Sequence, residues 1–374
     1  MHPMNNPGRA QLPPILFEPV FKEKLWGGRA LETRLGKRLP PGVSVGESWE
    51  ISGHGDDVTR ALTPPVAGQS LTQIIGQHPG FMGGRPAAPE AGFPLLYKFI
   101  DANDKLSVQV HPDDHAATAN GWDSRGKTEC WYIVDARPGA QIIVGFRKGV
   151  STETVRRAVA DGTLERILNY IPITAGDLLF IPAGTVHAIL DGTLLFEIQE
   201  SSDVTFRLFD WNRTDPSGRP RDLHVARSLQ VLDTACHDRH KIPPVTVSDT
   251  GGVTRLMRAA CRYFAIEEYV AAAAAAATLP VRDSFQAVTM IDGAAALHTA
   301  AGTAALSRGG TCFIPAAPQP ASVACDRPAR FLVTWIPDLR TDIVAPLRAA
   351  GVTDRDILLL GGFETGNDIA PAMR

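Results

Sequence analysis

Three short segments of the chain carry residue types that bind metal ions, each at a defined spacing. Gln109 and His111 are two residues apart in LSVQVH, so on a strand both side chains point to the same face. Glu129 opens the apolar run ECWYIV. His187 ends the pattern G-x5-P-x-G-x2-H, in which a turn, a strand and a Pro-x-Gly corner precede the histidine. Each residue alone is more often structural, so the case for a metal site depends on their combination.

Two imidazoles, one carboxylate and one amide oxygen form a ligand set of intermediate hardness for a divalent metal ion. Zinc, manganese, cobalt and iron(II) all accept such ligands, and we take Zn2+ as the expected ion. Four protein ligands leave room for water or substrate, as in catalytic metal sites. The pattern ending in His187, downstream of Gln-x-His and a glutamate, resembles the two sequence motifs of the cupins, and this resemblance implies that the combined residues bind a metal ion.

Short apolar runs bounded by turn residues dominate the part of the chain that carries these residues. Such runs occupy residues 95–100, 106–111, 130–135, 141–146, 177–182 and 194–199. Their length and spacing are typical of strands in a β-sandwich or barrel. Helices are expected at 70–78 after Ser70, at 151–169 as two short pieces, and at 222–233 starting from Asp222. The sequence therefore predicts a mainly β fold with a few peripheral helices.

A polar, proline-rich stretch at residues 237–249 is the best candidate for a domain boundary. We predict a flexible N-terminus at 1–12, a catalytic metal-binding cupin domain with short helical segments at 13–236, and a second cupin-like β domain at 250–374. In the second domain Gly309 and Pro315 repeat the spacing of Gly176 and Pro182, but Pro320 stands at the place of His187. The second domain is therefore expected to be degenerate and without metal.

The composition limits the function classes that remain. Of 374 residues, 44% are hydrophobic and 21% charged, and the net charge is −3, which offers no basic excess for binding nucleic acid. Five scattered cysteines, none in a CxxC pair, favour reduced thiols in a cytoplasmic protein. No apolar run approaches the roughly 20 residues of a membrane span. We expect a cytoplasmic monomer or homodimer that acts on a small molecule.

Longer segments around these residues carry a more specific resemblance. They read KEKLWGG (22–28), GESWEISGH (46–54), FPLLYKFIDANDKLSVQVHPDD (93–114), GKTECWYI (126–133), GDLLFIPAGTVHAI (176–189) and FEIQESSDVTFRLFDWNR (196–213). Through them the chain resembles class I mannose-6-phosphate isomerases (phosphomannose isomerases), in particular the short bacterial form. The resemblance implies two jelly-roll cupin barrels. It also implies a metal-dependent aldose–ketose isomerase that interconverts mannose 6-phosphate and fructose 6-phosphate through an enediol-type intermediate.

The resemblance also implies a role for each site residue. It places the metal ligands on Gln109, His111, Glu129 and His187. It makes Lys127, Arg207 and Glu197 the expected catalytic residues. Lys98, Ser107, Arg207 and Asp203 are expected to bind the substrate or its phosphate. Lys98 also stands out by itself, because a lysine inside the apolar strand LLYKFI usually faces a partner.

Several alternatives remain open at this point. The catalytic base is Glu197, a water on the metal, or another acid such as Glu47. The long eukaryotic form carries a phosphate-contacting lysine after the arginine, and whether Arg213 replaces it is undecided.

Two other functions are alternatives to the isomerase. A different cupin enzyme, such as an iron(II) oxygenase, would consume oxygen. A non-catalytic cupin would bind a sugar phosphate without turnover. Asp113 and Asp114 are expected to cap a turn or helix rather than bind metal.

Overall fold

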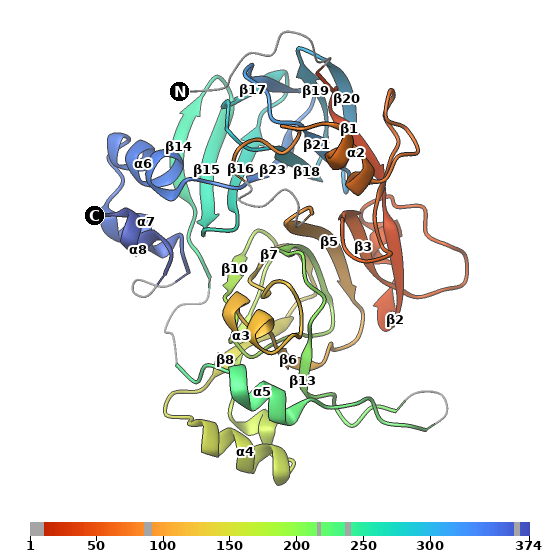
Figure 1. Ribbon diagram of the computed structural model, residues 1–374, viewed down its shortest axis with the longest axis vertical. Helices are drawn as coiled ribbons and strands as arrows, with labels where there is room; N and C mark the ends of the chain where they lie inside the picture. Colours follow the sequence, from red (N-terminus) through yellow and green to blue (C-terminus); the bar gives the residue numbers. More distant parts are fainter. Residues whose placement is uncertain (1–10, 86–91, 215–217, 236–240, 363–366) are drawn as a thin grey trace.

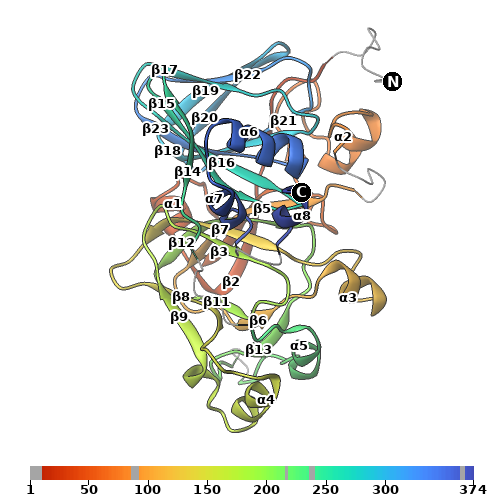
Figure 2. The same ribbon diagram turned by 90° about the vertical axis from the view of Figure 1, so that its left-hand side faces the viewer.

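The computed structural model describes residues 11–85, 92–214, 218–235, 241–362 and 367–374. Two β-sheet units lie one above the other along the long axis, with the first half of the chain forming most of the lower unit (Figures 1 and 2). Most of the predicted flexible segment 1–12 lies outside the described residues, as do residues 237–240 of the predicted linker. The predicted mainly β fold with few helices is confirmed.

The lower unit is built from two facing antiparallel sheets. One has the order β10 (Leu178–Ile181), β7 (Glu129–Ala136), β12 (Thr193–Glu200), β5 (Leu95–Ala102), β3 (Val45–Ile51) and β2 (Val20–Gly28). The other has the order β13 (Phe206–Phe209), β6 (Val108–Val110), β11 (His187–Ile189), β8 (Gln141–Phe146) and β9 (Leu168–Pro172). All six apolar runs singled out in the sequence overlap these strands, although β6 covers only Val108–Val110 of the run 106–111.

Strand β12 shows why the larger sheet is apolar on both sides. All eight of its residues are buried, from Thr193 to Glu200. Successive side chains alternate between faces. Leu195 packs inside the barrel with Trp131, whereas Phe196 joins the large apolar cluster that continues into the upper unit. A strand buried on both faces can therefore present polar groups to the barrel on one side and to the upper unit on the other.

The upper unit also contains two sheets. The larger has the order β14 (Val245–Thr250), β15 (Val253–Ala260), β16 (Ala265–Ala271), β23 (Ala329–Trp335), β18 (Gln286–Asp292), β21 (Thr311–Ile314), β1 (Ile15–Glu18) and β4 (Arg60–Ala61). The smaller has the order β17 (Ala275–Leu279), β22 (Ala321–Cys325), β19 (Ala294–Thr299) and β20 (Gly302–Ser307). The first strand of the described residues thus pairs with β21, with Ile15 opposite Phe313. The predicted domains 13–236 and 250–374 therefore share a sheet.

The repeat seen in the sequence corresponds to equivalent turns. Gly176 has a φ of 91° and precedes β10, and Gly309 has a φ of 78° and precedes β21. Positive φ values in this range favour glycine over residues with a Cβ. Each strand then ends one residue before its proline, Pro182 or Pro315.

The helices are short and peripheral. They are α1 (Ala30–Thr33), α2 (Leu71–Gln77), α3 (Asp114–Ala119), α4 (Thr152–Ala160), the 3₁₀ helix η2 (Leu164–Arg166), α5 (Val225–Val231), the π-helix η3 (Leu339–Val344), α6 (Ala345–Ala349), α7 (Asp354–Leu359) and α8 (Ile369–Ala372). Ser70 caps α2 as predicted, in a capping box with Gln73. None of the described helices has the length and apolar character required to cross a membrane.

Two helix predictions need correction at their boundaries. The second piece of 151–169 is a single 3₁₀ turn, and Leu168 already begins β9. Helix α5 begins at Val225 rather than just after Asp222. The reason is that His224 pairs first with β13: its N–H donates to the carbonyl of Arg207, and its Nδ1 accepts from the Arg207 N–H.

Candidate metal centre and surrounding site

The four predicted metal ligands come from both sheets of the lower barrel. Gln109 on β6 lies directly opposite His187 on β11. His111 follows the end of β6, and Glu129 opens β7 on the facing sheet. Gly184, with a φ of 85°, makes the corner before His187, and its N–H donates to the carbonyl of His111. The turn chemistry read from the sequence therefore links the two histidine segments directly.

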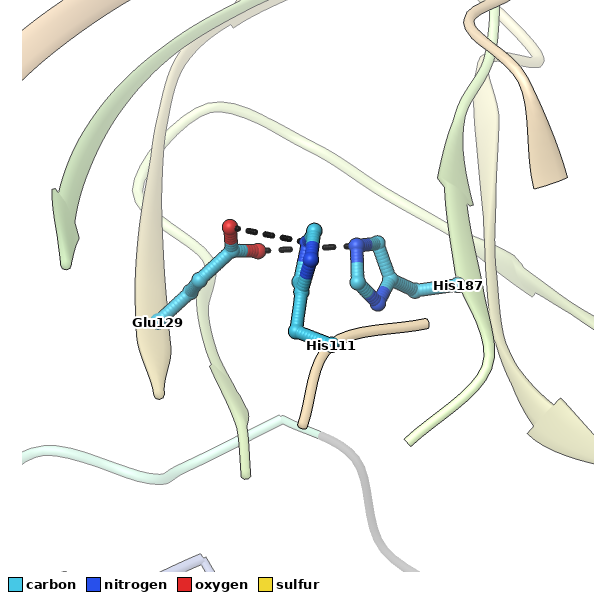
Figure 3. Close-up of side chains that lie close together, drawn as sticks. All are labelled: His111, Glu129 and His187. Atoms are coloured by element: carbon cyan, nitrogen blue, oxygen red, sulfur yellow. Dashed lines mark ion pairs between the residues drawn. The ribbon is translucent and has the colours of Figure 1, made fainter. Parts of the chain in front are cut away.

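His111, Glu129 and His187 converge in the barrel interior (Figure 3). One ligand atom from each lies within 4.8 Å of the others, and all three side chains are 1% exposed. The Nε2 atom of His111 is 3.3 Å from Glu129 Oε1, and the Nε2 atom of His187 is 3.5 Å from Glu129 Oε2. This spacing is small enough for one ion to be shared by all three.

Hydrogen bonds on the outer side of each imidazole fix its tautomer. The Nδ1 atom of His111 is 2.7 Å from the carbonyl oxygen of Val204, and the Nδ1 atom of His187 is 2.9 Å from that of Thr185. A carbonyl oxygen can only accept, so in the neutral rings Nδ1 carries the hydrogen and Nε2 is left with its lone pair. Both lone pairs face the centre, which is the arrangement found for metal-bound histidines.

The charge states of these groups favour a cation between them. Burial lowers the pKa of His111 to about 3, with a further contribution from the ammonium of Lys127. Burial also lowers the pKa of His187. For Glu129, burial opposes ionisation, but Lys127 and His111 outweigh it and hold the pKa well below its usual range. Two neutral imidazoles and a carboxylate are all acceptors, and Glu129 Oε2 has no hydrogen-bond partner. The set fits a divalent metal ion.

Gln109 lies at the same centre, but its amide nitrogen rather than its amide oxygen points toward the two imidazoles. Its Nε2 atom is 3.5 Å from His111 Nε2 and 3.3 Å from His187 Nε2. Its Oε1 atom accepts a hydrogen bond of 3.1 Å from Ser107 Oγ. A half-turn of the terminal amide would present the oxygen to the two imidazoles, because amide oxygen and nitrogen differ little in size. The structure therefore brings Gln109 and Ser107 to the predicted ligands.

Lys127 and Glu197 line the same interior. The Nζ atom of Lys127 is 2.9 Å from Glu129 Oε1 and 3.4 Å from His111 Nε2. Glu197 on β12 accepts from the indole Nε1 of Trp131 at 2.7 Å, and its other oxygen is 2.6 Å from Lys98 Nζ. All of these side chains are buried. They extend the site from the metal ligands across the larger sheet.

The two candidate bases differ in their protonation behaviour. Burial, reinforced by the charge of Glu129, raises the pKa of Glu197 to about 7. Burial would also raise the pKa of Glu47, but Lys98 and Lys24 outweigh it and lower that pKa to about 2. A base that works near neutral pH needs a pKa near the operating pH. Glu197 meets this condition and Glu47 does not.

Arg207 lies at the edge of the site on β13, opposite Gln109. It is half-buried, and its Nε has no hydrogen-bond partner. Burial and the neighbouring Arg221 lower its pKa, whereas Asp210 and Asp203 raise it. Asp203 itself is exposed. Arg207 thus presents a cation on the same row of side chains as two of the metal ligands, with Asp203 beside it.

The sequence left open whether Arg213 contacts the phosphate. In the structure its guanidinium binds Asp210 and a backbone carbonyl instead. Its Nη2 atom is 2.5 Å from Asp210 Oδ1, and its Nη1 donates to the carbonyl of Lys105. These contacts fix the turn at Trp211 and Asn212, both of which have positive φ values. The arrangement supports a structural role for this arginine.

Trp131 is a site residue that the sequence prediction missed. Besides its hydrogen bond to Glu197, its ring lies edge-on to the imidazole of His187 with 5.3 Å between centroids. A signal was present, because Trp131 is two residues beyond Glu129 on the same strand and therefore on the same face.

Two family models match this chain. The catalytic-domain model of phosphomannose isomerase type I matches residues 15–139, and the mannose-6-phosphate isomerase cupin-domain model matches residues 254–327. The first match contains three of the four predicted metal ligands. The second lies in the upper unit, which agrees with the prediction of a second cupin-type barrel.

Individual relatives agree with the family models. A probable mannose-6-phosphate isomerase of Bacillus subtilis is 37% identical over 259 residues, which cover 68% of this chain and 79% of the relative. A mannose-6-phosphate isomerase of Streptococcus mutans is 39% identical over 219 residues, or 59% of this chain and 67% of the relative. The crystal structure of a mannose 6-phosphate isomerase from Bacillus subtilis has a TM-score of 0.78 and 33% identity, covering 86% of this chain and 99% of that one.

Proposed function

This chain belongs to the phosphomannose isomerase type I family, and we propose that its lower barrel interconverts mannose 6-phosphate and fructose 6-phosphate. The observation that carries the proposal is the buried convergence of His111, Glu129 and His187 beside a carboxyl, Glu197, whose pKa is about 7. That combination offers both a cation site and a proton acceptor in one interior. An oxygenase or a pure binding protein would not require the second feature.

Interconversion of an aldose and a ketose moves a proton between two neighbouring carbons. We assign the removal and return of that proton to Glu197, because its pKa lets it gain and lose a proton near neutral pH. Trp131 and Lys98 hold its two oxygens, so the carboxylate is oriented before substrate binds. Burial on β12 keeps bulk water away from the proton during transfer.

The negative charge that develops on the sugar oxygens needs positive partners. A bound divalent ion polarises or orients such oxygens as a Lewis acid. We assign Lys127 to the same region, because its ammonium already faces Glu129 and His111. A fixed cation in a buried site stabilises developing charge without reorganising at the moment of reaction.

The phosphate is assigned to the edge of the site. Arg207 is the main candidate, because a guanidinium binds an oxyanion through two parallel hydrogen bonds. Ser107, on the segment that leads into β6, is proposed as a further donor to the phosphate, and Asp203, beside the arginine, is proposed to contact the substrate. Lys98 remains a predicted phosphate contact, although its ammonium is already paired with Glu197.

The identity of the metal and the cellular location are proposals too. We propose Zn2+, because two imidazoles and one carboxylate form a common catalytic zinc set. We propose a cytoplasmic location, because the described cysteines, Cys130, Cys261, Cys312 and Cys325, are buried free thiols.

The deciding experiment is a coupled assay of mannose 6-phosphate isomerisation. It would be run on chelator-treated protein and on the same protein reloaded with zinc, manganese or cobalt. Activity that returns only with metal supports the proposed reaction and the site together. If metal binds at one ion per chain and no isomerisation follows with any of the three, the proposed reaction is wrong and a binding role becomes the better explanation.

A further inference from the structure

We propose that Tyr263 of the upper unit, acting through Asp114 and Glu200, is a positioning residue for Lys127 and Glu129. The proposal rests on the function assigned above and gives the upper barrel a part in it. Tyr263 lies in the turn between β15 and β16, and its hydroxyl donates a 2.7 Å hydrogen bond to Asp114 Oδ2. Asp114 belongs to α3 of the lower unit, so this bond joins the two units.

The segment from Gly126 to Glu129 has no regular structure until β7 begins, and side chains accept hydrogen bonds from two of its backbone N–H groups. The N–H of Gly126 donates to Asp114 Oδ1 at 2.7 Å, and the N–H of Thr128 donates to Glu200 Oε2 at 2.8 Å. The N–H of Lys127 donates to the carbonyl of Pro112 at 3.0 Å. Two carboxyl side chains therefore fix the backbone on either side of Lys127.

The two carboxyl groups also bind each other. Glu200 and Asp114 share a side-chain hydrogen bond, and burial together with the charge of Asp114 raises the pKa of Glu200 to about 8. For Asp114, burial works against ionisation, but the Gly126 N–H and the Tyr263 hydroxyl outweigh it and lower the pKa. Glu200 is thus the proton donor and Asp114 the acceptor. Tyr263, Glu200 and Gly126 all donate to one carboxylate.

The segment that begins at Gly126 packs tightly against the start of α3. A Cβ placed on Gly126 would lie 2.5 Å from the backbone carbon of Asp113, which shows how closely the segment packs on the start of α3. Glu200 alternates with Gln199 on β12, so it faces the upper unit while Glu197 faces the barrel. A shift of Asp114 would therefore be transmitted to Gly126 and on to Lys127.

The test compares two hydroxyl deletions in the upper unit. Tyr263→Phe removes the bond to Asp114, whereas Thr334→Val removes a buried 2.9 Å bond to Tyr97 that also joins the units but does not touch the segment. For each variant we would measure zinc affinity by chelator competition, kcat and KM for mannose 6-phosphate, and the thermal midpoint. We expect Tyr263→Phe to lower zinc affinity and kcat about tenfold, as loss of a group supporting a metal ligand does, with KM nearly unchanged. We expect Thr334→Val to affect only the thermal midpoint.

A second pair of variants tests the same group if Tyr263→Phe folds poorly. Glu200→Gln keeps an acceptor for the Thr128 N–H and a donor for Asp114, so it should retain nearly normal zinc affinity and kcat. Glu200→Ala loses both and should resemble Tyr263→Phe. Equal zinc affinity and kcat in Tyr263→Phe and Thr334→Val, or equal losses in the two Glu200 variants, would overturn the proposal. Because zinc affinity is measured without turnover, an inactive wild-type protein would refute the proposed reaction and leave this test intact.

Discussion

Lys98 on β5 and Glu197 on β12 are direct cross-strand neighbours, and their side chains form a buried ion pair with 2.6 Å between Nζ and Oε2. Register alone places them together, since opposed residues on antiparallel strands have neighbouring Cβ atoms. The pair explains how a fully buried carboxyl can have a pKa near neutrality. Burial and Glu129 raise that pKa, and Lys98 limits the rise.

Replacing Lys98 by methionine is expected to move the acid limb of the pH–kcat profile to higher pH. Lys98 lowers the pKa of Glu197, so its loss raises that pKa above about 7, and the carboxylate needed as a base forms only at higher pH. Stability should fall by roughly 3 kcal/mol, because one partner of a buried pair is left unpaired.

Lys37→Met is the matched control for this variant. It breaks a pair of similar burial, with 2.7 Å between Lys37 Nζ and Glu50 Oε1. It should cost comparable stability and leave the pH profile in place. An unshifted acid limb in Lys98→Met would contradict the assignment of Glu197 as the base.

His187→Ala is expected to abolish metal binding and isomerisation together. The ligand set has only four members, and removing one imidazole takes away a donor whose tautomer is already fixed by Thr185. Metal content per chain, measured by elemental analysis after dialysis, checks the first loss, and the coupled assay checks the second. Full metal occupancy in this variant would show that the ion lies elsewhere.

Arg207→Ala is expected to keep the metal and lose most turnover. Charge-assisted hydrogen bonds contribute about 1.5–3 kcal/mol, so kcat/KM for the phosphorylated sugar should fall roughly ten- to a hundredfold. Arg213→Ala is the control, because its guanidinium is held by Asp210 and should matter for the thermal midpoint only. Normal kcat/KM in Arg207→Ala would remove the phosphate role assigned to it.

Glu200 should make the free energy of unfolding fall as the pH rises from about 4.5 to about 8. Its pKa is about 8 in the folded protein and near 4.5 in the unfolded chain, so the folded state holds a proton that the unfolded state loses between these values. Stability from this group is full below pH 4.5, declines between pH 4.5 and 8, and is lost above 8. Denaturant titrations at pH 5 and pH 9 should show a smaller decline in Glu200→Gln than in the wild-type protein.

The metal ligands could be predicted because the chain resembles the cupin family at these residues, and the motifs that carry the resemblance are local. Gln109 and His111 follow the two-residue period of a strand, and Gly184 marks a corner that only a residue tolerant of positive φ fills easily. The strands were predictable because their signals are local too. The sequence could also suggest Glu197, since a charged residue within a buried strand needs a partner.

The contacts between distant parts of the chain were not predictable in this way. Tyr263 and Asp114 are 149 residues apart, and nothing near either residue indicates the other. The pairing of β1 with β21 likewise joins residues 15–16 to residues 312–313. The period of hydrophobic residues and the positions of turn residues describe only a segment and its neighbours. They therefore cannot predict the order of strands in a sheet.

The place of β1 has a consequence for synthesis on the ribosome. A chain is made from its N-terminus, and domains made first generally fold first. Here Ile15 and Leu16 pair with β21, which is translated almost three hundred residues later. The edge that β1 offers to β21 therefore stays without that partner until β21 has been made. The nascent upper sheet is completed only when Ile15 and Leu16 meet a strand made almost three hundred residues after them.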